Sequence, residues 1–231
     1  MSFHRPNPDT DEAPRNLRPG TITRLAQQKR DAERVSVFID DDFAFGLALD
    51  LVIKAGLRKG QDLTVEEQQA LLDDEERLKA KAAALDYIAY KARTEHEVRQ
   101  KLQRKGFAEP IADEAVARMR ELGYLDDTDY ARAYARGRLN GRGHGPHRIR
   151  SDLFRRGVAR SIIDTVLDDL TEPDDLRETA LRHGRKRWRR LQREEDPYKR
   201  RKKLSDFLMR RGFDFDLIRE VTATLEAEDE D

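Results

Sequence analysis

Arginine side chains dominate one stretch of the chain, and their chemistry is the binding of anions. Nine arginines and a single acid, Asp152, stand between Arg132 and Arg160. Guanidinium groups bind both carboxylates and phosphates, so residue type does not choose between an acidic protein and a nucleic acid. A solvated helical face is the competing interpretation, although such a face usually mixes both signs of charge. The predicted partner-binding residues are Arg132, Arg136, Arg138, Arg142, Arg148, Arg150, Arg155 and Arg156.

A second basic stretch surrounds the single tryptophan of the chain. Twelve Lys and Arg residues stand between Arg182 and Lys203, with Trp188 among them. An aromatic ring between cations is typical of single-strand binding, in which bases stack and phosphates are neutralised. The alternative, which we favour for Trp188 itself, is that the indole fills a hydrophobic core. The predicted nucleic-acid-binding residues are Arg185, Lys186, Arg187, Arg189 and Arg190.

Other residues that could carry chemistry do not form an active-site pattern. His144 and His147 are spaced like metal ligands, but a metal site needs more ligands and the chain has no cysteine. The glycines from Gly141 to Gly145 lack the Gly-Lys-Ser/Thr end of a phosphate-binding loop. Asp126 and Asp127 could be a catalytic carboxylate pair, although a helix N-cap is the better interpretation. The sequence therefore predicts no catalytic residue, metal or cofactor.

The elements that position these arginines follow an internal repeat of roughly 50 residues. Counted from Gly157, apolar residues stand 8 and 4 positions before it and 1, 5, 9 and 13 positions after it. The same spacing holds around Gly106 and Gly212, and two basic residues precede each glycine. Spacing by four predicts two short helices, and the glycine between them supplies the positive φ that ends the first. The structural repeat residues are Gly106, Gly157, Gly212, Leu102, Leu153 and Leu208.

Local patterns give the remaining elements. Strands are predicted at 22–28, 34–40 and 43–46, followed by a short helix at 47–55. Capping boxes at Thr64–Glu67 and Thr94–Glu97 begin two helices, the first running to about Ala92 unless Asp73 and Asp74 break it. Its predicted buried stripe is Leu71, Leu78, Ala82, Leu85 and Ala89. Asp127 or Thr128 is expected to cap a helix that ends near Leu139, and residues 141–145 form a flexible connector.

The predicted fold class is all-α: an elongated array of three tandem three-helix repeats, preceded by a small β-rich N-terminal module with a short helix. The expected boundaries are a disordered tail at 1–20, the N-terminal module at 21–62, repeats at 63–126, 127–171 and 172–226, and an acidic tail at 227–231. Charged residues make up 40% of the 231 residues, and the net charge is zero. No apolar run approaches the roughly 18 residues of a membrane span, so a cytoplasmic protein is expected.

The repeat carries a family resemblance. The motifs are Arg93-Thr94-Glu95-x-Glu97-Val98-x3-Leu102-x3-Gly106-Phe107, Gly123-Tyr124-Leu125-Asp126-Asp127-x2-Tyr130-Ala131 and Gly145-Pro146-x-Arg148-Ile149-x3-Leu153-x3-Gly157-Val158. In these motifs the chain resembles the bacterial regulatory protein RecX, closely from about Ala82 to Leu170. The segment from Ile22 to Gly60 is similar to an N-terminal extension that some members carry.

The resemblance implies a non-enzymatic modulator of the RecA recombinase. Such a protein lies in the groove of the RecA–DNA filament and inhibits ATP turnover, strand exchange and coprotease function. The implied partner is the RecA filament, with single- or double-stranded DNA as a further possibility, and the protein is expected to be a monomer. The alternative is a helical-repeat nucleic-acid-binding protein that acts directly on DNA or RNA, because the basic stretches would serve either role.

Overall fold

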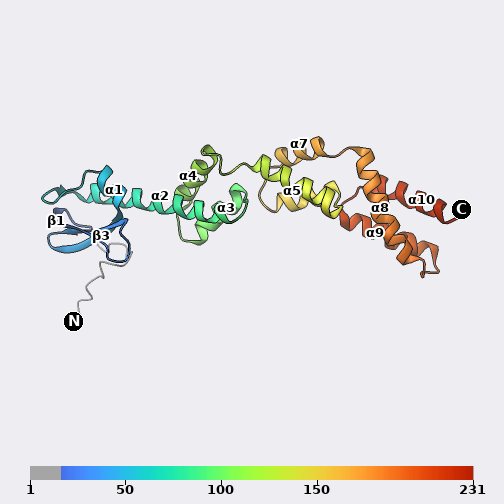
Figure 1. The fold of residues 1–231 in the computed structure, drawn as a ribbon, viewed down its shortest axis with the longest axis horizontal. Helices are drawn as coiled ribbons and strands as arrows, with labels where there is room; N and C mark the ends of the chain where they lie inside the picture. Colours follow the sequence, from blue (N-terminus) through green and yellow to red (C-terminus); the bar gives the residue numbers. More distant parts are fainter. Residues whose placement is uncertain (1–16, 231) are drawn as a thin grey trace.

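The computed structural model describes residues 17–230 and shows an elongated molecule, with a small sheet at one end and helices following one another along its length (Figure 1). The predicted disordered tail lies largely outside the described residues, as does Asp231. The molecule is mostly helical with a small N-terminal sheet, which agrees with the predicted class.

The N-terminal module is a four-stranded antiparallel sheet with one short helix. Its elements are β1 (Gly20–Gln27), β2 (Arg34–Ile39), β3 (Asp42–Ala48), α1 (Leu49–Lys54) and β4 (Asp62–Leu63), and the strand order is β3-β2-β1-β4. The sequence predicts only three strands, because a two-residue strand is too short to show alternation. Ile22, Val37 and Leu47 are fully buried between the sheet and the helices that cover it.

A long helix, α2 (Val65–Tyr90), joins the module to the rest of the molecule. The capping box of Thr64 and Glu67 begins it as predicted, and the helix continues unbroken through Asp73 and Asp74. Glu75 fixes the module to α2. One of its carboxylate oxygens pairs with Arg34 Nη1 at 2.7 Å, and the other accepts the Ala48 N–H at 2.7 Å.

The predicted buried stripe of α2 is wrong beyond Leu71. Leu78 and Leu85 are 41% and 39% exposed, and Ala82 and Ala89 are also exposed. The buried residues are instead the alanines at 80, 83 and 84. These small side chains allow α4 (Glu109–Glu121) to approach α2 closely, and contact with α4 decides which face of α2 is buried.

Within residues 17–230, nine helices form three units, each with its own hydrophobic core. The first unit consists of the second half of α2 with α3 (Glu95–Arg104) and α4 (Glu109–Glu121). The second unit consists of α5 (Asp127–Arg142), α6 (Pro146–Phe154) and α7 (Arg160–Leu170). The third unit consists of α8 (Pro173–Leu191), α9 (Pro197–Arg211) and α10 (Phe215–Glu230).

Equivalent residues of the repeat occupy equivalent places in the three units. Leu102, Leu153 and Leu208 are fully buried. The glycines that follow the middle helices adopt the left-handed conformation expected of them, with φ of 95° at Gly106, 81° at Gly157 and 88° at Gly212. The leucine one helical turn before each glycine is buried, and its packing holds the middle helix of each unit against the other two helices.

Several helix ends differ from the positions predicted from the sequence. Asp126, one residue earlier than expected, caps α5 by accepting the Thr128 and Asp129 N–H groups at 2.7 and 3.0 Å. The predicted flexible connector is wrong, because α5 continues to Arg142, ends at left-handed Gly143, and is followed directly by the cap of α6 at Gly145. Residues 227–230, predicted to be a separate acidic tail, continue α10.

Neighbouring units are joined in the same way at two places. Thr94, the cap of α3, donates its hydroxyl to the Arg156 carbonyl at 2.7 Å. Gly145, the cap of α6, donates its N–H to the Arg211 carbonyl at 2.7 Å, and the His147 N–H reaches the Gly212 carbonyl at 3.1 Å. In both joints the start of one middle helix therefore meets the end of the next middle helix along the chain.

Candidate anion-binding surface

The arginines of the second unit fall into a paired set and an unpaired set. Arg132 pairs with Asp169 at 3.3 Å and Arg150 with Asp164 at 3.0 Å. Arg155, the C-cap of α6, pairs with Asp152 of that helix. The prediction of a nearly acid-free face is therefore wrong for these three side chains. The acids that neutralise Arg132 and Arg150 lie on α7, beyond the basic stretch in sequence, and α7 packs across α5 and α6.

Arg156 belongs to the joint between the first and second units. Its Nη1 donates to Glu97 Oε1 and to the Tyr130 hydroxyl, each at 3.0 Å, and its guanidinium lies 5.1 Å from the Tyr134 ring centroid. The side chain is 33% exposed. These contacts give Arg156 a structural role between the first and second units, although the sequence predicts it to be a partner-binding residue.

The remaining arginines of the second unit have no carboxylate partner within residues 17–230. Arg138 lies over the Tyr134 ring at 4.8 Å, and Arg148 Nη1 donates to the Arg210 carbonyl at 3.0 Å. Arg136 and Arg142 are exposed and make no side-chain hydrogen bond or ion pair with the described part of the chain. These four are the predicted residues best placed to meet an external anion.

The joint between the second and third units, here called the second joint, brings cations of the third unit to this surface. His183 of α8 packs against Gly143, so close that a Cβ on that glycine would lie 1.9 Å from the imidazole. Arg211 Nη1 donates to the carbonyls of Arg142 and Gly143 at 2.7 and 3.1 Å. The end of α5, the end of α9 and the middle of α8 therefore meet at one place.

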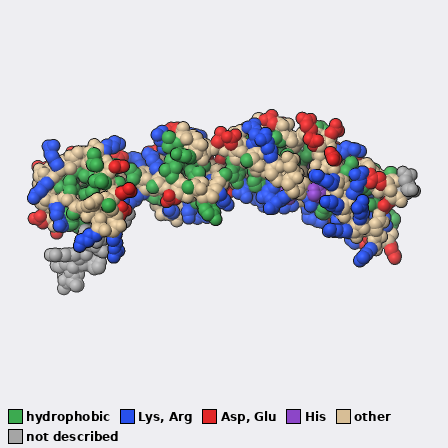
Figure 2. All heavy atoms as spheres, viewed as in Figure 1, with side chains coloured by type: hydrophobic (Ala, Val, Ile, Leu, Met, Phe, Trp, Pro, Cys, Tyr) green, Lys and Arg blue, Asp and Glu red, His purple; other side chains and the backbone are tan. Residues whose placement is uncertain are grey.

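We name these cations the junction cluster. Its members come from both units and surround the second joint: Arg138, Arg142, Arg148, Arg182, Lys186, Arg210 and Arg211. Figure 2 shows Lys and Arg side chains gathering over this part of the molecule. The junction cluster thus brings together cations from the two basic stretches that the sequence treats separately.

The electrostatics of two histidines report the density of positive charge in the junction cluster. Burial, together with the nearby Arg211, Arg182 and Lys186, lowers the pKa of His183 to about 4. Burial also lowers the pKa of His144, and Arg148 and Arg138 act in the same direction. The share of these shifts that the cations cause disfavours added positive charge and favours an anion, whereas burial disfavours charge of either sign.

The predicted nucleic-acid-binding run of α8 is divided between two faces. Lys186, Arg189 and Arg190 are exposed and have no hydrogen bond or ion pair within the described residues. Arg185 instead pairs with Glu228 of α10, and Arg187 lies 5.7 Å from the Phe207 ring centroid. Trp188 is 5% exposed and belongs to the core of the third unit, which confirms the interpretation that we favoured.

Sequence reasoning missed the role of Arg182, Arg210 and Arg211 in the junction cluster. The available signal was the repeat register, because Arg156 and Arg211 both directly precede a repeat glycine. Each reaches back to the preceding unit in the structure. Once the contacts of Arg156 are known, the repeat predicts that Arg211 makes equivalent contacts with the preceding unit. The sequence alone does not show the first of these joints.

The carboxylate pair has a structural role. Asp126 caps α5, and Asp127 Oδ1 accepts the Glu95 N–H at the start of α3 at 3.0 Å. Burial raises the pKa of Asp127, and the hydrogen bond from Glu95 opposes that shift. Both carboxylates are thus occupied by helix N-termini, as the N-cap interpretation predicts. Within residues 17–230 no group of three His, Cys, Asp or Glu side chains could hold a metal ion.

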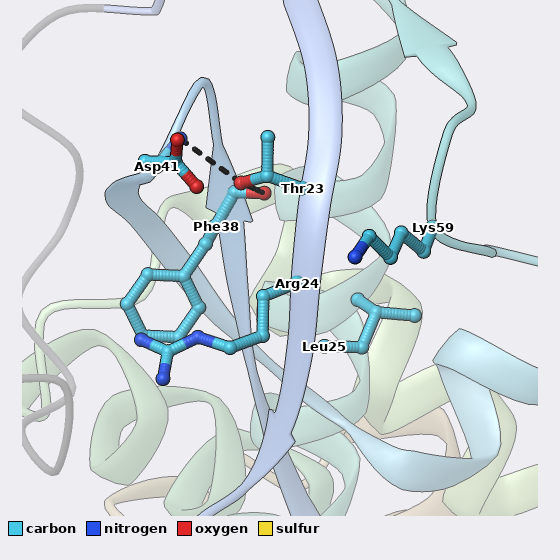
Figure 3. A pocket seen from close by; sticks show the side chains of 6 residues that line it. All are labelled: Thr23, Arg24, Leu25, Phe38, Asp41 and Lys59. Carbon is cyan, nitrogen blue, oxygen red and sulfur yellow. Dashed lines mark hydrogen bonds between the residues drawn. The ribbon is translucent and has the colours of Figure 1, made fainter.

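A pocket of about 460 Å³ lies in the N-terminal module, away from the junction cluster. Figure 3 shows Arg24 lying along the Phe38 ring, with its guanidinium 3.7 Å from the ring centroid. The Asp41 N–H donates to Thr23 Oγ1 at 2.9 Å, and Lys59 lines another part of the wall. These side chains do not pair a nucleophile with a base.

Four family models match the chain in order along its length. The RecX N-terminal domain matches residues 20–64, and the first three-helix domain of RecX matches residues 80–119. The second three-helix domain matches residues 126–167, and the third matches residues 174–222. The helical matches fall on the three units described above.

Whole-chain relatives agree with these matches. The regulatory protein RecX of Clostridium botulinum (strain Eklund 17B / Type B) is 33% identical over 201 residues, which are 87% of this chain and 93% of the relative. A crystal structure of regulatory protein RecX has a TM-score of 0.73 and 27% identity, and the match covers 88% of this chain and 99% of that one. The crystal structure of RecX from Lactobacillus salivarius has a TM-score of 0.61 and 25% identity, covering 67% of this chain and 99% of that one. The chain therefore belongs to the RecX family of regulatory proteins.

Proposed function

We propose that this chain is a non-enzymatic regulator of the RecA recombinase, which binds the RecA–DNA filament and inhibits its ATPase, strand-exchange and coprotease activities. The observation that carries the proposal is the run of RecX matches in chain order from residue 20 to residue 222. In this role the protein would act in homologous recombination, DNA repair and the SOS response, in the cytoplasm and as a monomer.

The junction cluster supports a filament as the partner. A RecA–DNA filament presents both carboxylates and phosphates, and guanidinium groups bind either. The elongated molecule spreads its side chains over a long surface, so that cations of the second and third units can act together (Figure 1). We therefore assign filament binding to Arg138, Arg142 and Arg148, with Arg182, Lys186 and Arg211 beside them.

The two carboxylates and His183, which might have served catalysis, have structural partners, and this supports a regulatory role. Asp126 and Asp127 are bound to helix N-termini. His183 fills the joint against Gly143, and His144 lies in the same joint. None of the helices described between residues 17 and 230 is long and apolar enough to cross a membrane.

A steady-state ATPase assay tests the proposal. The host RecA protein is assembled on single-stranded DNA, and the purified chain is added in increasing amounts. We expect dose-dependent loss of ATP turnover, and no ATP hydrolysis by the chain alone. Intrinsic hydrolysis, or undiminished RecA turnover at a large excess of the chain, would contradict the proposal.

A second candidate function is direct binding to DNA or RNA, which the unpaired cations of α8 favour. Lys186, Arg189 and Arg190 are exposed on one helix without carboxylate partners in the described part of the chain. Contact with phosphates releases counterions, so the binding constant should fall steeply with salt. Tight, steeply salt-dependent binding to free nucleic acid, together with no effect on RecA, would favour this second function.

A further inference from the structure

The acidic end of α10 lies on the basic side of the third unit. The term acidic end denotes Glu226, Glu228 and Asp229. Glu228 accepts from Arg185 Nε at 3.0 Å and from Arg185 Nη2 at 2.5 Å. Glu226 pairs with Arg201 at 3.0 Å, and Asp229 pairs with Arg200 at 3.5 Å. Three carboxylates of one helix end thus each meet a guanidinium from α8 or α9.

Asp229 also accepts hydrogen bonds from donors around Trp188. Trp188 Nε1 donates to Asp229 Oδ2 at 2.9 Å, and Gln192 Nε2 donates to the same oxygen at 2.7 Å. The Arg200 guanidinium lies 5.5 Å from the indole ring centroid. An indole N–H, an amide and a guanidinium therefore converge on one anionic group, and the same donors could bind a phosphate.

Polar contacts alone hold the acidic end in place. Leu225 is the last buried residue of α10, at 1% exposure, and residues 227–229 are exposed. Arg185 and Glu228 are 48% and 42% exposed, and such pairs contribute about 0–1 kcal/mol each. The acidic end can leave the surface without opening the hydrophobic core, so a polyanion can compete for its place.

The position of these acids disfavours the helix that carries them. Carboxylates at a helix C-terminus oppose the helix dipole, and no basic residue stands in the last turn of α10. Their stabilising contacts are instead with α8 and α9. The acidic end is thus held by the surface that it covers, and its departure relieves an unfavourable interaction with the dipole.

We infer that Arg185, Trp188, Gln192, Arg200 and Arg201 form a nucleic-acid site, here called the Trp188 face, which the acidic end of α10 keeps covered. Its ligand is single-stranded nucleic acid, whose phosphates replace the three carboxylates. A flexible strand suits the face, because its phosphates can follow the row of cations, while the indole N–H of Trp188 adds a hydrogen-bond donor and not a stacking surface. The site needs no recombinase, so it goes beyond the RecA regulation proposed above.

The first test compares two variants with the same loss of negative charge. The release variant carries Glu226→Gln, Glu228→Gln and Asp229→Asn. The control carries Glu178→Gln, Asp216→Asn and Glu220→Gln, which frees Arg177 and Arg219 of the same unit from their partners. Binding to a fluorescein-labelled oligothymidylate is measured by anisotropy. We expect about a tenfold gain in affinity for the release variant and under about a threefold gain for the control.

A third variant locates the effect. Adding Arg185→Gln and Arg201→Gln to the release variant should return its affinity to that of the intact protein, because these two arginines lie under the acidic end. Equal affinities of the release variant and the control would overturn the inference. So would an undiminished gain after Arg185 and Arg201 are neutralised.

The second test begins with the intact protein, so its first measurement does not depend on the variants folding. Trp188 is the single tryptophan, and its indole N–H is bound to Asp229. Saturating oligothymidylate should shift its emission, and the release variant should show the shifted emission before any ligand is added. Unchanged emission at saturation would contradict the inference. Both tests omit RecA, so their failure would leave the ATPase assay, and the function it tests, unaffected.

Discussion

The hydroxyl of Thr94 donates a hydrogen bond to the carbonyl of Arg156, 62 residues further along the chain, at 2.7 Å. The same hydroxyl accepts the Glu97 N–H at 3.1 Å and so begins α3. One side chain therefore caps a helix of the first unit and fastens the end of α6 in the second. A residue recognised from the sequence as a local cap is also part of a joint between units.

Replacing Thr94 by valine should cost more stability than the same change at Thr64. Both threonines cap a helix through a capping box, worth about 1 kcal/mol. Thr94 is fully buried, and its loss also leaves the Arg156 carbonyl without this donor, which costs about 1–3 kcal/mol more. Urea unfolding of the two variants measures the difference. Equal losses would mean that the bond to Arg156 contributes nothing.

Gly157 and Gly106 provide a second matched pair. Both have positive φ, so alanine at either should destabilise the protein by about 1 kcal/mol. A Cβ on Gly157 would lie 2.3 Å from the His96 side chain, whereas a Cβ on Gly106 meets nothing within 4 Å. We expect Gly157→Ala to cost roughly 1–3 kcal/mol more, the usual range for overpacking. Thermal and urea unfolding that rank the two variants equally would contradict close packing in this joint.

Stability should fall as the pH falls from about 6.5 towards 4, because of His183. Its folded-state pKa is lowered to about 4, so the unfolded chain binds the proton more readily in this window. Below the folded-state pKa both states are protonated, and the loss is complete. Burial first, and then the facing Arg211, Arg182, Lys186 and His144, make the added charge on His183 unfavourable.

The His183→Gln variant should therefore lose less stability over this pH window than the parent protein. Urea unfolding at several pH values measures the slope, and His147→Gln, a change at an exposed histidine nearby, is the control. Higher salt should reduce the parent's slope, since it screens the surrounding arginines. Parallel slopes for His183→Gln and the parent would show that His183 does not titrate in this joint.

The sequence predicts the local elements well, because their causes are local. The spacing of apolar residues around Gly157 specifies the two helices and the left-handed residue between them. The capping box at Thr94 marks a helix start to the residue. Trp188 was correctly assigned to a core, because its helix needs an apolar stripe at that position.

The sequence does not predict side-chain burial or ion pairing where these depend on contacts with residues far away in the chain. Arg132 and Arg150 look uncompensated along the chain, but α7 brings Asp169 and Asp164 against them. Leu78 looks like a core residue, but α4 packs against the alanines on another face of α2. The junction cluster has the same cause, since the joint between units unites residues of α5, α8 and α9.

The measurement that tests the central claim most directly compares two triple variants of the second unit in the RecA ATPase assay. The junction variant carries Arg138→Gln, Arg142→Gln and Arg148→Gln. The control carries Arg132→Gln, Arg150→Gln and Arg155→Gln, which removes the same charge from arginines that already have carboxylate partners. Exposed pairs of this kind contribute about 0–1 kcal/mol each, so both variants should fold.

We predict that the junction variant needs about tenfold more protein for half-inhibition of RecA, the equivalent of about 1.4 kcal/mol of binding. The control should remain within about threefold of the intact protein, because its arginines are already neutralised. Normal inhibition by the junction variant, together with weakened inhibition by the control, would contradict the assignment of filament binding to the junction cluster.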